Sequence, residues 1–273
     1  MKEKNPLVSV NIPTYNSART LKKCLESVKR QTYKRIEIVI IDSSSKDKSL
    51  EISKSFNCKI IQYPGALLGA RYAGVKASKG KFILLLDSDQ ILEKTAIERG
   101  VKLLKEMDML WLEEFTYNPK SFLEKLFDAD RKLVQKHYSG FISPTGGVIL
   151  PRFYRKSVLL KGMDKIPKRS LPICAAHDHA IIYYEVNKVS KKIQKLPKAV
   201  WHMEPSNLIR FWKKTYRWGK TTKDLTKKNI YVNLIKSKMH FRKFYWDEFS
   251  LSFKSSILRV LRGVPYLLGY RFG

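Results

Sequence analysis

The sequence predicts an α/β protein with a mixed, mostly parallel central sheet flanked by helices. The first indication is the run Phe-Ile-Leu-Leu-Leu at 82–86, whose lack of polar residues is typical of a strand buried on both faces. The second is the alternation of such runs with helical patterns through the first 90 residues, which indicates a parallel sheet. The third is that each run ends in polar residues, because the carboxyl ends of parallel strands meet at one edge of a sheet.

Short signals predict the elements of the first half in order. Pro13 ends a first β-rich run, and Leu21, Leu25 and Val28 then repeat at the spacing of one helix face. Asp42 ends a second buried run and leads into a polar turn. The predicted strands are 7–12, 36–41, 59–62 and 82–86, and the predicted helices begin after Ser17 and cover about 48–56 and 65–77.

The second half is less regular. The sequence predicts helices at 91–107, 119–138, 181–189 and from residue 207 onward, and strands at 109–117, 148–150 and 198–202. We therefore expect one domain at 1–205, with a regular half at 1–90 and a less regular half at 91–205. A basic, amphipathic helical region at 206–273 would follow as a C-terminal extension.

The charge of the chain indicates an anionic partner. Lys and Arg total 54 against 24 Asp and Glu, a net charge of +30, and the surplus is concentrated after residue 190. Nucleic acid, an acidic membrane or phosphorylated substrates fit such a surplus, and so does a basic surface that only meets solvent. The three cysteines are scattered, which argues against a disulfide framework and favours a reducing cytosol.

Two carboxylates one residue apart, Asp87 and Asp89, directly follow the most apolar run. Burial of a charge is unfavourable unless the charge is paired or binds a cation. Carboxylates at this spacing can reach Mg²⁺ or Mn²⁺, and the metal can bridge the two phosphates of a nucleotide. The position at the end of a central strand therefore predicts a divalent cation that holds a phosphorylated substrate.

Three stretches resemble the nucleotide-binding half of family 2 glycosyltransferases, which have the GT-A fold: VSVNIPTYN at 8–16, IVIIDSSSKD at 38–47, and GAR at 69–71 leading to the two carboxylates. The resemblance continues more loosely to about residue 219 and implies that 1–205 is the catalytic domain, with a nucleotide-binding half at 1–90 and an acceptor-side half at 91–205. It departs from the family at the serine-rich turn 43–45 and at Tyr72, which bears on the identity of the nucleotide base.

The resemblance implies roles for individual residues of the donor site. Pro13, Thr14, Tyr15 and Asp42 would hold the base, either uracil or guanine, and Arg71 would lie near the base or diphosphate. Asp87 would face the ribose, Asp89 would ligate the metal, and His202 would complete the metal shell with Asp87 and Asp89. An imidazole is an acceptable ligand for Mn²⁺, although a lone histidine can equally be structural.

The resemblance also implies an acceptor side. Asp178 matches the general base of inverting enzymes, which removes the proton of the acceptor hydroxyl as it attacks the anomeric carbon. Gly146 and Gly147, in a loop before the predicted strand at 148–150, and Lys214 and Arg217, in the basic helix, would lie near the diphosphate or acceptor. For the glycines a simple turn is an equal interpretation.

The predicted function is an inverting, metal-dependent glycosyltransferase that uses Mn²⁺ or Mg²⁺, a UDP- or GDP-sugar donor, and a lipid-linked or glycan acceptor. The segment 249–270 is apolar on one helical face and carries basic residues, so it can lie on an anionic membrane or dock onto the protein. We expect a cytoplasmic enzyme, peripheral at the inner face of the cell membrane. The alternative is a basic nucleic-acid-binding protein on an α/β scaffold, because its aromatic and basic residues could stack and neutralise nucleotides.

Overall fold

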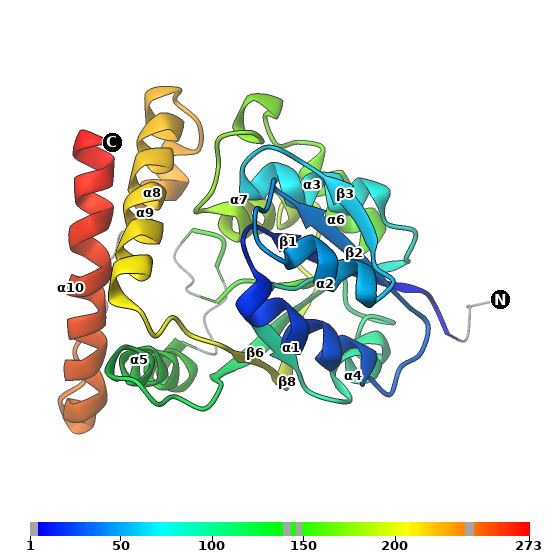
Figure 1. Ribbon diagram of the computed structural model, residues 1–273, viewed down its shortest axis with the longest axis horizontal. Coiled ribbons are helices and arrows are strands. Elements are labelled where there is room, and N and C mark those ends of the chain that lie inside the picture. The colour runs from blue at the N-terminus through cyan, green and yellow to red at the C-terminus, as the bar shows by residue number, and fades with distance from the viewer. Residues whose placement is uncertain (1–4, 139–142, 146–148, 238–242) are drawn as a thin grey trace.

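The computed structural model describes residues 5–138, 143–145, 149–237 and 243–273 (Figure 1). The first half alternates strands and helices, as the sequence predicts. Its elements are β1 (Val8–Thr14), α1 (Ala18–Lys29), β2 (Ile36–Asp42), α2 (Ser49–Ser55), β3 (Lys59–Gln62), α3 (Leu67–Ala77) and β4 (Phe82–Leu85).

The second half mixes short strands with longer helices. Its elements are β5 (Gln90–Leu92), α4 (Ala96–Leu103), β6 (Met109–Thr116), α5 (Phe122–Tyr138), β7 (Phe153–Arg155), α6 (Lys156–Met163), η1 (Lys168–Ser170), α7 (Asp178–Val186), β8 (Ile193–His202), α8 (Leu208–Lys227), α9 (Val232–Ser237), η2 (Trp246–Glu248) and α10 (Phe249–Phe272). The last strand ends at His202 and α8 begins at Leu208, close to the boundary expected at 205/206. The division into two domains stays a prediction.

One eight-stranded sheet has the strand order β3-β2-β1-β4-β7-β6-β8-β5. The pairs β3–β2, β2–β1, β1–β4 and β6–β8 are parallel, and the pairs that include β7 or β5 are antiparallel. Because β7 runs against both β4 and β6, the strands β6 and β8 point in the same direction as β4. The carboxyl ends of β1, β2, β4, β6 and β8 therefore lie along one edge of the sheet.

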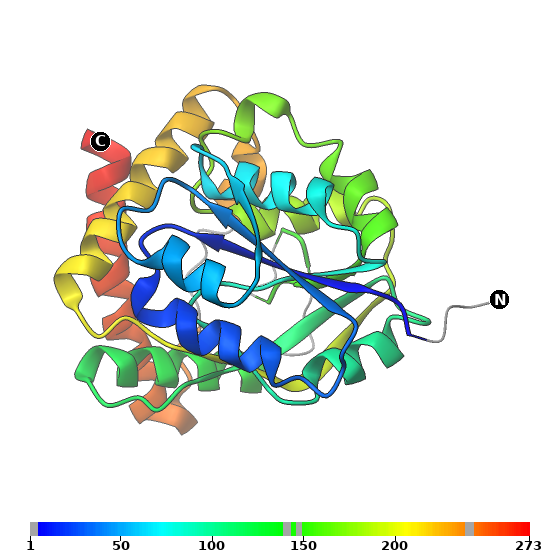
Figure 2. The same cartoon turned by 45° about the vertical axis from the view of Figure 1, so that its right-hand side comes forward.

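Alternate residues of the central strands enter two cores, as expected for a sheet covered on both faces. Val10 and Leu84 face the core that α1 and α4 cover, whereas Ile83 and Leu85 face the core that α3, α6 and α7 cover (Figures 1 and 2). All four side chains are essentially inaccessible to solvent. This two-sided burial explains why residues 82–86 contain no polar side chain.

The helices α8 and α10 lie side by side on the opposite side of the molecule from the N-terminus (Figures 1 and 2). Their backbones touch at two glycines. A Cβ atom on Gly219 would lie 1.9 Å from the carbonyl oxygen of Tyr266, and one on Gly269 would lie 2.0 Å from that of Tyr216. Glycine at these two positions therefore permits the close approach.

The structure corrects the predicted end of the first strand. Pro13 lies inside β1, which continues to Thr14. The pairing of β1 with β4 stops at Asn11, so beyond that point β1 has only β2 as a neighbour. Proline is tolerated there because its missing N–H falls where one side of the strand is unpaired.

Two predictions for the second half are also wrong in part. The helix predicted at 91–107 is shorter, because residues Gln90–Leu92 pair with β8 as β5 and α4 begins only at Ala96. The strand predicted at 148–150 begins instead at Phe153. Arg152 is hydrogen-bonded to the strands on both sides: the Arg152 N–H donates to the Leu110 carbonyl, and the Arg152 carbonyl accepts from the Leu85 N–H. Pro151 has no N–H, so it cannot extend a strand that is paired on both sides.

Candidate metal and nucleotide site

Acidic residues and a histidine meet at the carboxyl edge of the sheet. Asp42 ends β2, Asp87 follows β4, and His202 ends β8. Gln90 in β5 lies opposite His202 in β8, so the preceding residue, Asp89, comes beside this strand end. The Met203 N–H donates to the Asp89 carbonyl at 2.8 Å and fixes that approach.

Asp87, Asp89 and His202 form a cluster whose potential ligand atoms all lie within 4.8 Å of one another. Asp89 Oδ1 lies 3.4 Å from His202 Nε2. Two carboxylates and an imidazole are a donor set that Mn²⁺ accepts, with oxygen ligands also suited to Mg²⁺. The residues therefore fit a divalent cation.

The two carboxylates of this cluster differ in whether their oxygens are already paired with other side chains. Asp87 Oδ1 pairs with Arg71 and Asp87 Oδ2 lies 2.7 Å from Arg152 Nη1. Burial would raise the pKa of Asp87, but the two guanidiniums hold it well below its ordinary value. Asp89 has only His202 as an ionic neighbour among the described side chains. We therefore expect Asp89 and His202 to offer the direct ligands.

Glu204 orients the histidine. Its Oε2 lies 3.4 Å from His202 Nδ1, a buried atom without a hydrogen-bond partner among the described residues. Burial lowers the pKa of His202, but Asp89 and Glu204 outweigh it, so the pKa is raised. A carboxylate on the Nδ1 side favours the tautomer whose Nε2 lone pair faces Asp89.

A chain of buried ion pairs joins the two ends of the cluster. Arg131 contacts Glu204 at 2.6 Å and Glu114 at 2.7 Å, and Arg152 contacts Glu114 at 2.9 Å. Arg152 also pairs with Asp87. The ionic contacts therefore run without a break through His202, Glu204, Arg131, Glu114, Arg152 and Asp87. The pKa of Glu204 is lowered to about 2, because His202 and Arg131 outweigh the effect of its burial. Each charge in the chain has an opposite neighbour, which burial requires.

Arg71 links the cluster to Asp178. This guanidinium is 1% exposed, pairs with Asp87, and lies 2.5 Å through Nε from Asp178 Oδ2. Burial would raise the pKa of Asp178, but the Arg71 guanidinium outweighs it and lowers the pKa, so the carboxylate is ionised at neutral pH. Arg71 Nη1 is buried without a partner among the described residues and remains a donor.

His179, beside Asp178 at the start of α7, is neutral. Burial, Arg152 and Arg71 lower its pKa to about 4. Its Nε2 lies 2.6 Å from Arg152 Nη1 and, in the neutral ring, accepts a hydrogen bond from it. His177, which directly precedes Asp178, contacts Thr222 in α8 at 3.1 Å and does not join the cluster.

The expected base-binding residues lie at the next strand ends. Asp42 is fully buried and accepts hydrogen bonds from Thr14 Oγ1 and from the Ser45 N–H, both at 2.9 Å. Tyr15, one residue beyond the end of β1 and its Pro13, is 53% exposed, and the Arg217 guanidinium lies 5.5 Å from its ring centroid. Arg217 in α8 therefore lies beside Tyr15, and its expected place near the diphosphate or acceptor stays a prediction.

The other expected residues are less informative. The Lys214 ammonium lies over the ring of Trp218, on its own helix, at 5.1 Å. Gly146 and Gly147 lie outside the described residues.

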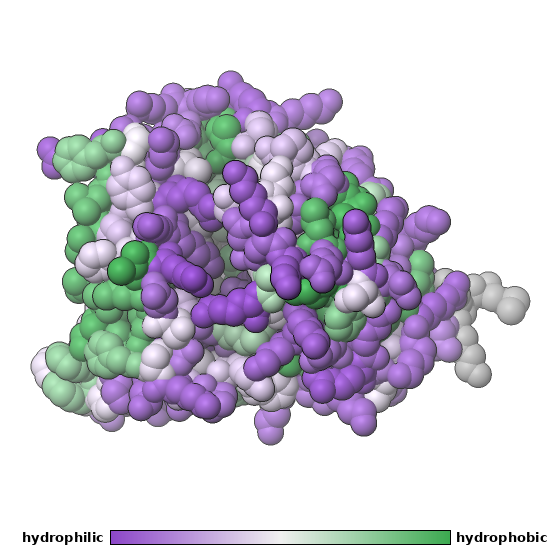
Figure 3. All heavy atoms as spheres, viewed as in Figure 1, coloured by the Kyte–Doolittle hydropathy of each residue, from purple (hydrophilic) through white to green (hydrophobic). Residues whose placement is uncertain are grey.

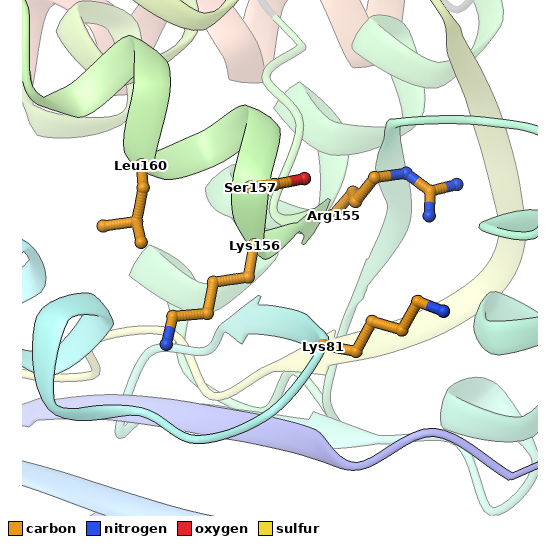
Figure 4. Close-up of a pocket in the computed structure, with 5 residues that line it drawn as sticks. All are labelled: Lys81, Arg155, Lys156, Ser157 and Leu160. Carbon is orange, nitrogen blue, oxygen red and sulfur yellow. The ribbon is translucent and has the colours of Figure 1, made fainter. Parts of the chain in front are cut away.

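A hollow of about 370 Å³ between β4 and α6 is lined by Lys81, Arg155, Lys156, Ser157 and Leu160 (Figure 4). It lies at the amino-terminal end of β4, so it is separate from the cluster at the other end of that strand.

Sequence reasoning missed four members of the site: Glu114, Arg131, Arg152 and Glu204. All four are far from the carboxylates in sequence, and they come together through the strand order and, for Arg131, through the packing of α5 on β6. Glu204 had a local signal, since it follows His202 by two residues and a carboxylate near a metal-binding histidine is a common orienting partner.

The chain is similar to glycosyltransferases along its first half. Residues 9–155 match Glycosyl transferase family 2. Glycosyltransferase GlyG of Streptococcus pneumoniae is 33% identical over 109 residues, which cover 37% of this chain and 36% of that protein. Glycosyltransferase AglE of Haloferax volcanii is 36% identical over 106 residues, which cover 35% of this chain and 34% of that protein. The chain thus spans about a third of the length of these curated relatives.

Solved structures share the fold over most of the chain. Staphylococcus aureus TarS has a TM-score of 0.58 and 15% identity, with 97% of this chain and 55% of that chain covered. A mannosyltransferase of Pyrobaculum calidifontis, solved with GDP-mannose and Mn²⁺, has a TM-score of 0.56 and 15% identity over 97% of this chain and 73% of that one. A Mycobacterium tuberculosis glucosyl-3-phosphoglycerate synthase, solved with Mn²⁺ and UDP, has a TM-score of 0.53 and 14% identity over 82% of this chain and 81% of that one. These neighbours are GT-A glycosyltransferases, so the expected fold is confirmed.

Proposed function

Because the chain belongs to glycosyl transferase family 2, we propose that it is an inverting, metal-dependent glycosyltransferase that uses a nucleoside diphosphate sugar. The observation that carries the proposal is the cluster of Asp87, Asp89 and His202 at the carboxyl edge of the sheet. Ligands of open α/β sheets bind at this edge. The family also favours a transferase over the nucleic-acid-binding alternative, and acidic strand ends would repel a nucleic acid.

Asp89 and His202 would hold Mn²⁺ or Mg²⁺, with Asp87 beside them. When bound, the cation would neutralise the charge that develops on the departing diphosphate. Arg217 over Tyr15 would add a positive charge beside the donor, and Lys214 one turn away remains a further candidate. Pro13, Thr14, Tyr15 and Asp42 would border the base, and Arg71 and Asp87 would face the ribose and diphosphate.

Arg71 would act mainly by positioning. It is buried between Asp87 and Asp178 and holds both carboxylates in place. The unpaired Nη1 is its remaining donor toward a ligand. In this proposal one guanidinium fixes the donor-side carboxylate, Asp87, relative to the general base, Asp178.

Asp178 would be the base for a hydroxyl acceptor. It is ionised at neutral pH, as a general base must be, and Arg71 holds it in place. The acceptor oxygen would form its bond to the anomeric carbon on the face opposite the diphosphate, whose bond breaks, and the configuration would invert. A polyprenyl phosphate acceptor is already an anion and would not need this base.

The acceptor would be lipid-linked or presented at a membrane surface, with the enzyme peripheral at the inner face of the cell membrane. The net charge of +30 supports attraction to an anionic surface. Within the described residues, none of the helices is both long and apolar enough to cross a bilayer.

The test is a panel of UDP- and GDP-sugars with Mn²⁺ or Mg²⁺, scored by release of the nucleoside diphosphate. We expect metal-dependent release that falls roughly a hundredfold or more in Asp89→Asn, because a direct ligand is lost. Asp164→Asn is the matched control, since Asp164 forms an exposed pair with Lys76 on another face. Equal release by the two variants would remove the metal role, and a product that retains the donor's anomeric configuration would remove inversion.

A further inference from the structure

The helix α10 has its small residues inside and its large apolar residues outside. The side chains that it buries against the rest of the protein include Ser252, Ser255 and Gly269, and Ser255 Oγ donates to Asp130 in α5 at 2.6 Å. A helix on a water-facing protein surface normally has the opposite arrangement. Leu258 is the one aliphatic residue longer than alanine that α10 buries fully; it packs with Phe211 of α8, and the partly buried Ile257 and Leu261 pack against the same cluster.

The outer face of α10 presents a continuous apolar row. Most of its members are three, four or seven residues apart, and these spacings return to one face of a helix. They are Phe249, Phe253, Val260, Val264, Leu267, Leu268 and Phe272, each between 46% and 69% exposed. Figure 3 shows this as hydrophobic surface along the margin that α10 forms. Isolated exposed apolar residues need no explanation, but a contiguous row of this length does.

Exposed aromatic side chains cluster where α10 begins. The rings of Phe244 and Trp246 lie 4.9 Å apart, and Phe249 stacks on Phe253 at 5.9 Å. Trp246 is 78% exposed. Aromatic rings are favoured at the level of lipid head groups, whereas in water this grouping buries little area.

The charge of α8 and α10 is strongly positive, and of the two acidic residues just before α10, Asp247 and Glu248, the second is paired with Lys136. On α8 and α10, both described in full, the one acidic residue is Asp224. The basic residues of the two helices are Arg210, Lys213, Lys214, Arg217, Lys220, Lys223, Lys227, Lys254, Arg259, Arg262 and Arg271. This composition complements an anionic lipid surface.

We propose that the outer face of α10 and the aromatic cluster of residues 244–253 form a surface that docks on an anionic bilayer, with α10 lying in the plane of the interface. This proposal deepens the membrane part of the proposed function and rests on it for its biological role. An apolar helix face flanked by Lys and Arg is the pattern of interfacial helices. A two-fold contact between two copies would instead bring the basic residues of α10 toward their own equivalents, with no acidic residue on that helix to pair with them.

The test measures binding of the full chain to vesicles by co-sedimentation. Vesicles of phosphatidylcholine alone are compared with vesicles that also contain phosphatidylglycerol. The variant replaces Phe249, Phe253, Val264 and Leu267 together by Ser, all of them exposed, so that the buried side of α10 is unchanged. Phe122→Ser is the matched control, because Phe122 in α5 is 66% exposed and lies outside the proposed surface.

We expect binding that needs phosphatidylglycerol, weakens with salt, and falls roughly a hundredfold or more in the fourfold variant while Phe122→Ser binds normally. Equal binding by the two variants would overturn the proposal. So would a failure of the wild-type chain to bind while it forms a dimer that the fourfold variant dissociates. Binding of Mn²⁺ and UDP or GDP is measured in parallel, because its loss would contradict the proposed function without affecting the vesicle result.

Discussion

The close approach of α8 and α10 predicts that alanine has opposite effects on stability at two glycines of α10. A methyl group on Gly269 would lie 2.0 Å from the Tyr216 carbonyl oxygen, whereas one on Gly263 would have no atom within 4 Å. Both positions are helical, so Ala would bring the same gain in helix propensity, up to about 1 kcal/mol. The two substitutions therefore differ only in the clash.

The magnitude follows from the geometry. The clash is with backbone, so the helices must separate by roughly 1 Å before the contact is tolerable, and overpacking of this kind costs about 1–3 kcal/mol. At the upper end, Gly269→Ala would lower the free energy of unfolding by about 2 kcal/mol, after the propensity gain is included. Gly263→Ala would raise it by up to about 1 kcal/mol.

Urea unfolding followed by circular dichroism measures the difference, and hydrogen exchange of the α8 and α10 amides locates it. We expect faster exchange in these two helices for Gly269→Ala alone. If both variants have the same stability and the same exchange, the packing of α10 against α8 through Gly269 is wrong.

Three further predictions concern the site. Glu204→Gln should weaken Mn²⁺ binding roughly 10–100-fold, because His202 loses its orienting carboxylate; an unchanged dissociation constant, measured by electron paramagnetic resonance, would contradict this. His179 has a pKa of about 4 in the folded chain against about 6.5 unfolded, so protonation favours the unfolded state and metal-free protein should lose about 2 kcal/mol from this residue between pH 7 and pH 5. In urea unfolding, His179→Asn should lack this contribution to the loss of unfolding free energy. An identical loss in both proteins would refute the prediction for His179. Asp178→Asn should lower transfer to a hydroxyl acceptor by about 10²-fold or more but leave nucleotide binding intact, whereas substantial remaining transfer would indicate an acceptor such as a polyprenyl phosphate that needs no base.

The parallel half of the fold could be predicted because its signals are local. An apolar run that ends in polar residues indicates a buried strand, and β2 and β4 begin where the sequence predicts while β3 matches in full. The prediction of a helix at 91–107 was wrong at its start, because Ile91 and Leu92 belong to a strand that pairs with β8. No nearby residue indicates this pairing. The pattern Thr95-Ala96-Ile97-Glu98 is a helix-start signal that could have moved the boundary.

The site could be predicted only where it depends on strand ends. Asp89 and His202 come together as expected, because both lie at the carboxyl edge of the sheet. The chain through Arg131 and Glu114 could not be predicted, since it depends on α5 packing against β6, a contact that local spacing does not encode. Arg71 was expected near a ligand, yet its pairing with both Asp87 and Asp178 follows from α3 and α7 lying on the same face of the sheet.

Titration of Mn²⁺ into the chain in the presence of UDP or GDP, followed by electron paramagnetic resonance of the free ion, tests the metal site directly. We expect that the wild-type chain and Asp164→Asn deplete the free-ion signal and that Asp89→Asn does not. Depletion by Asp89→Asn equal to that of Asp164→Asn would show that the cation binds elsewhere or not at all through these carboxylates.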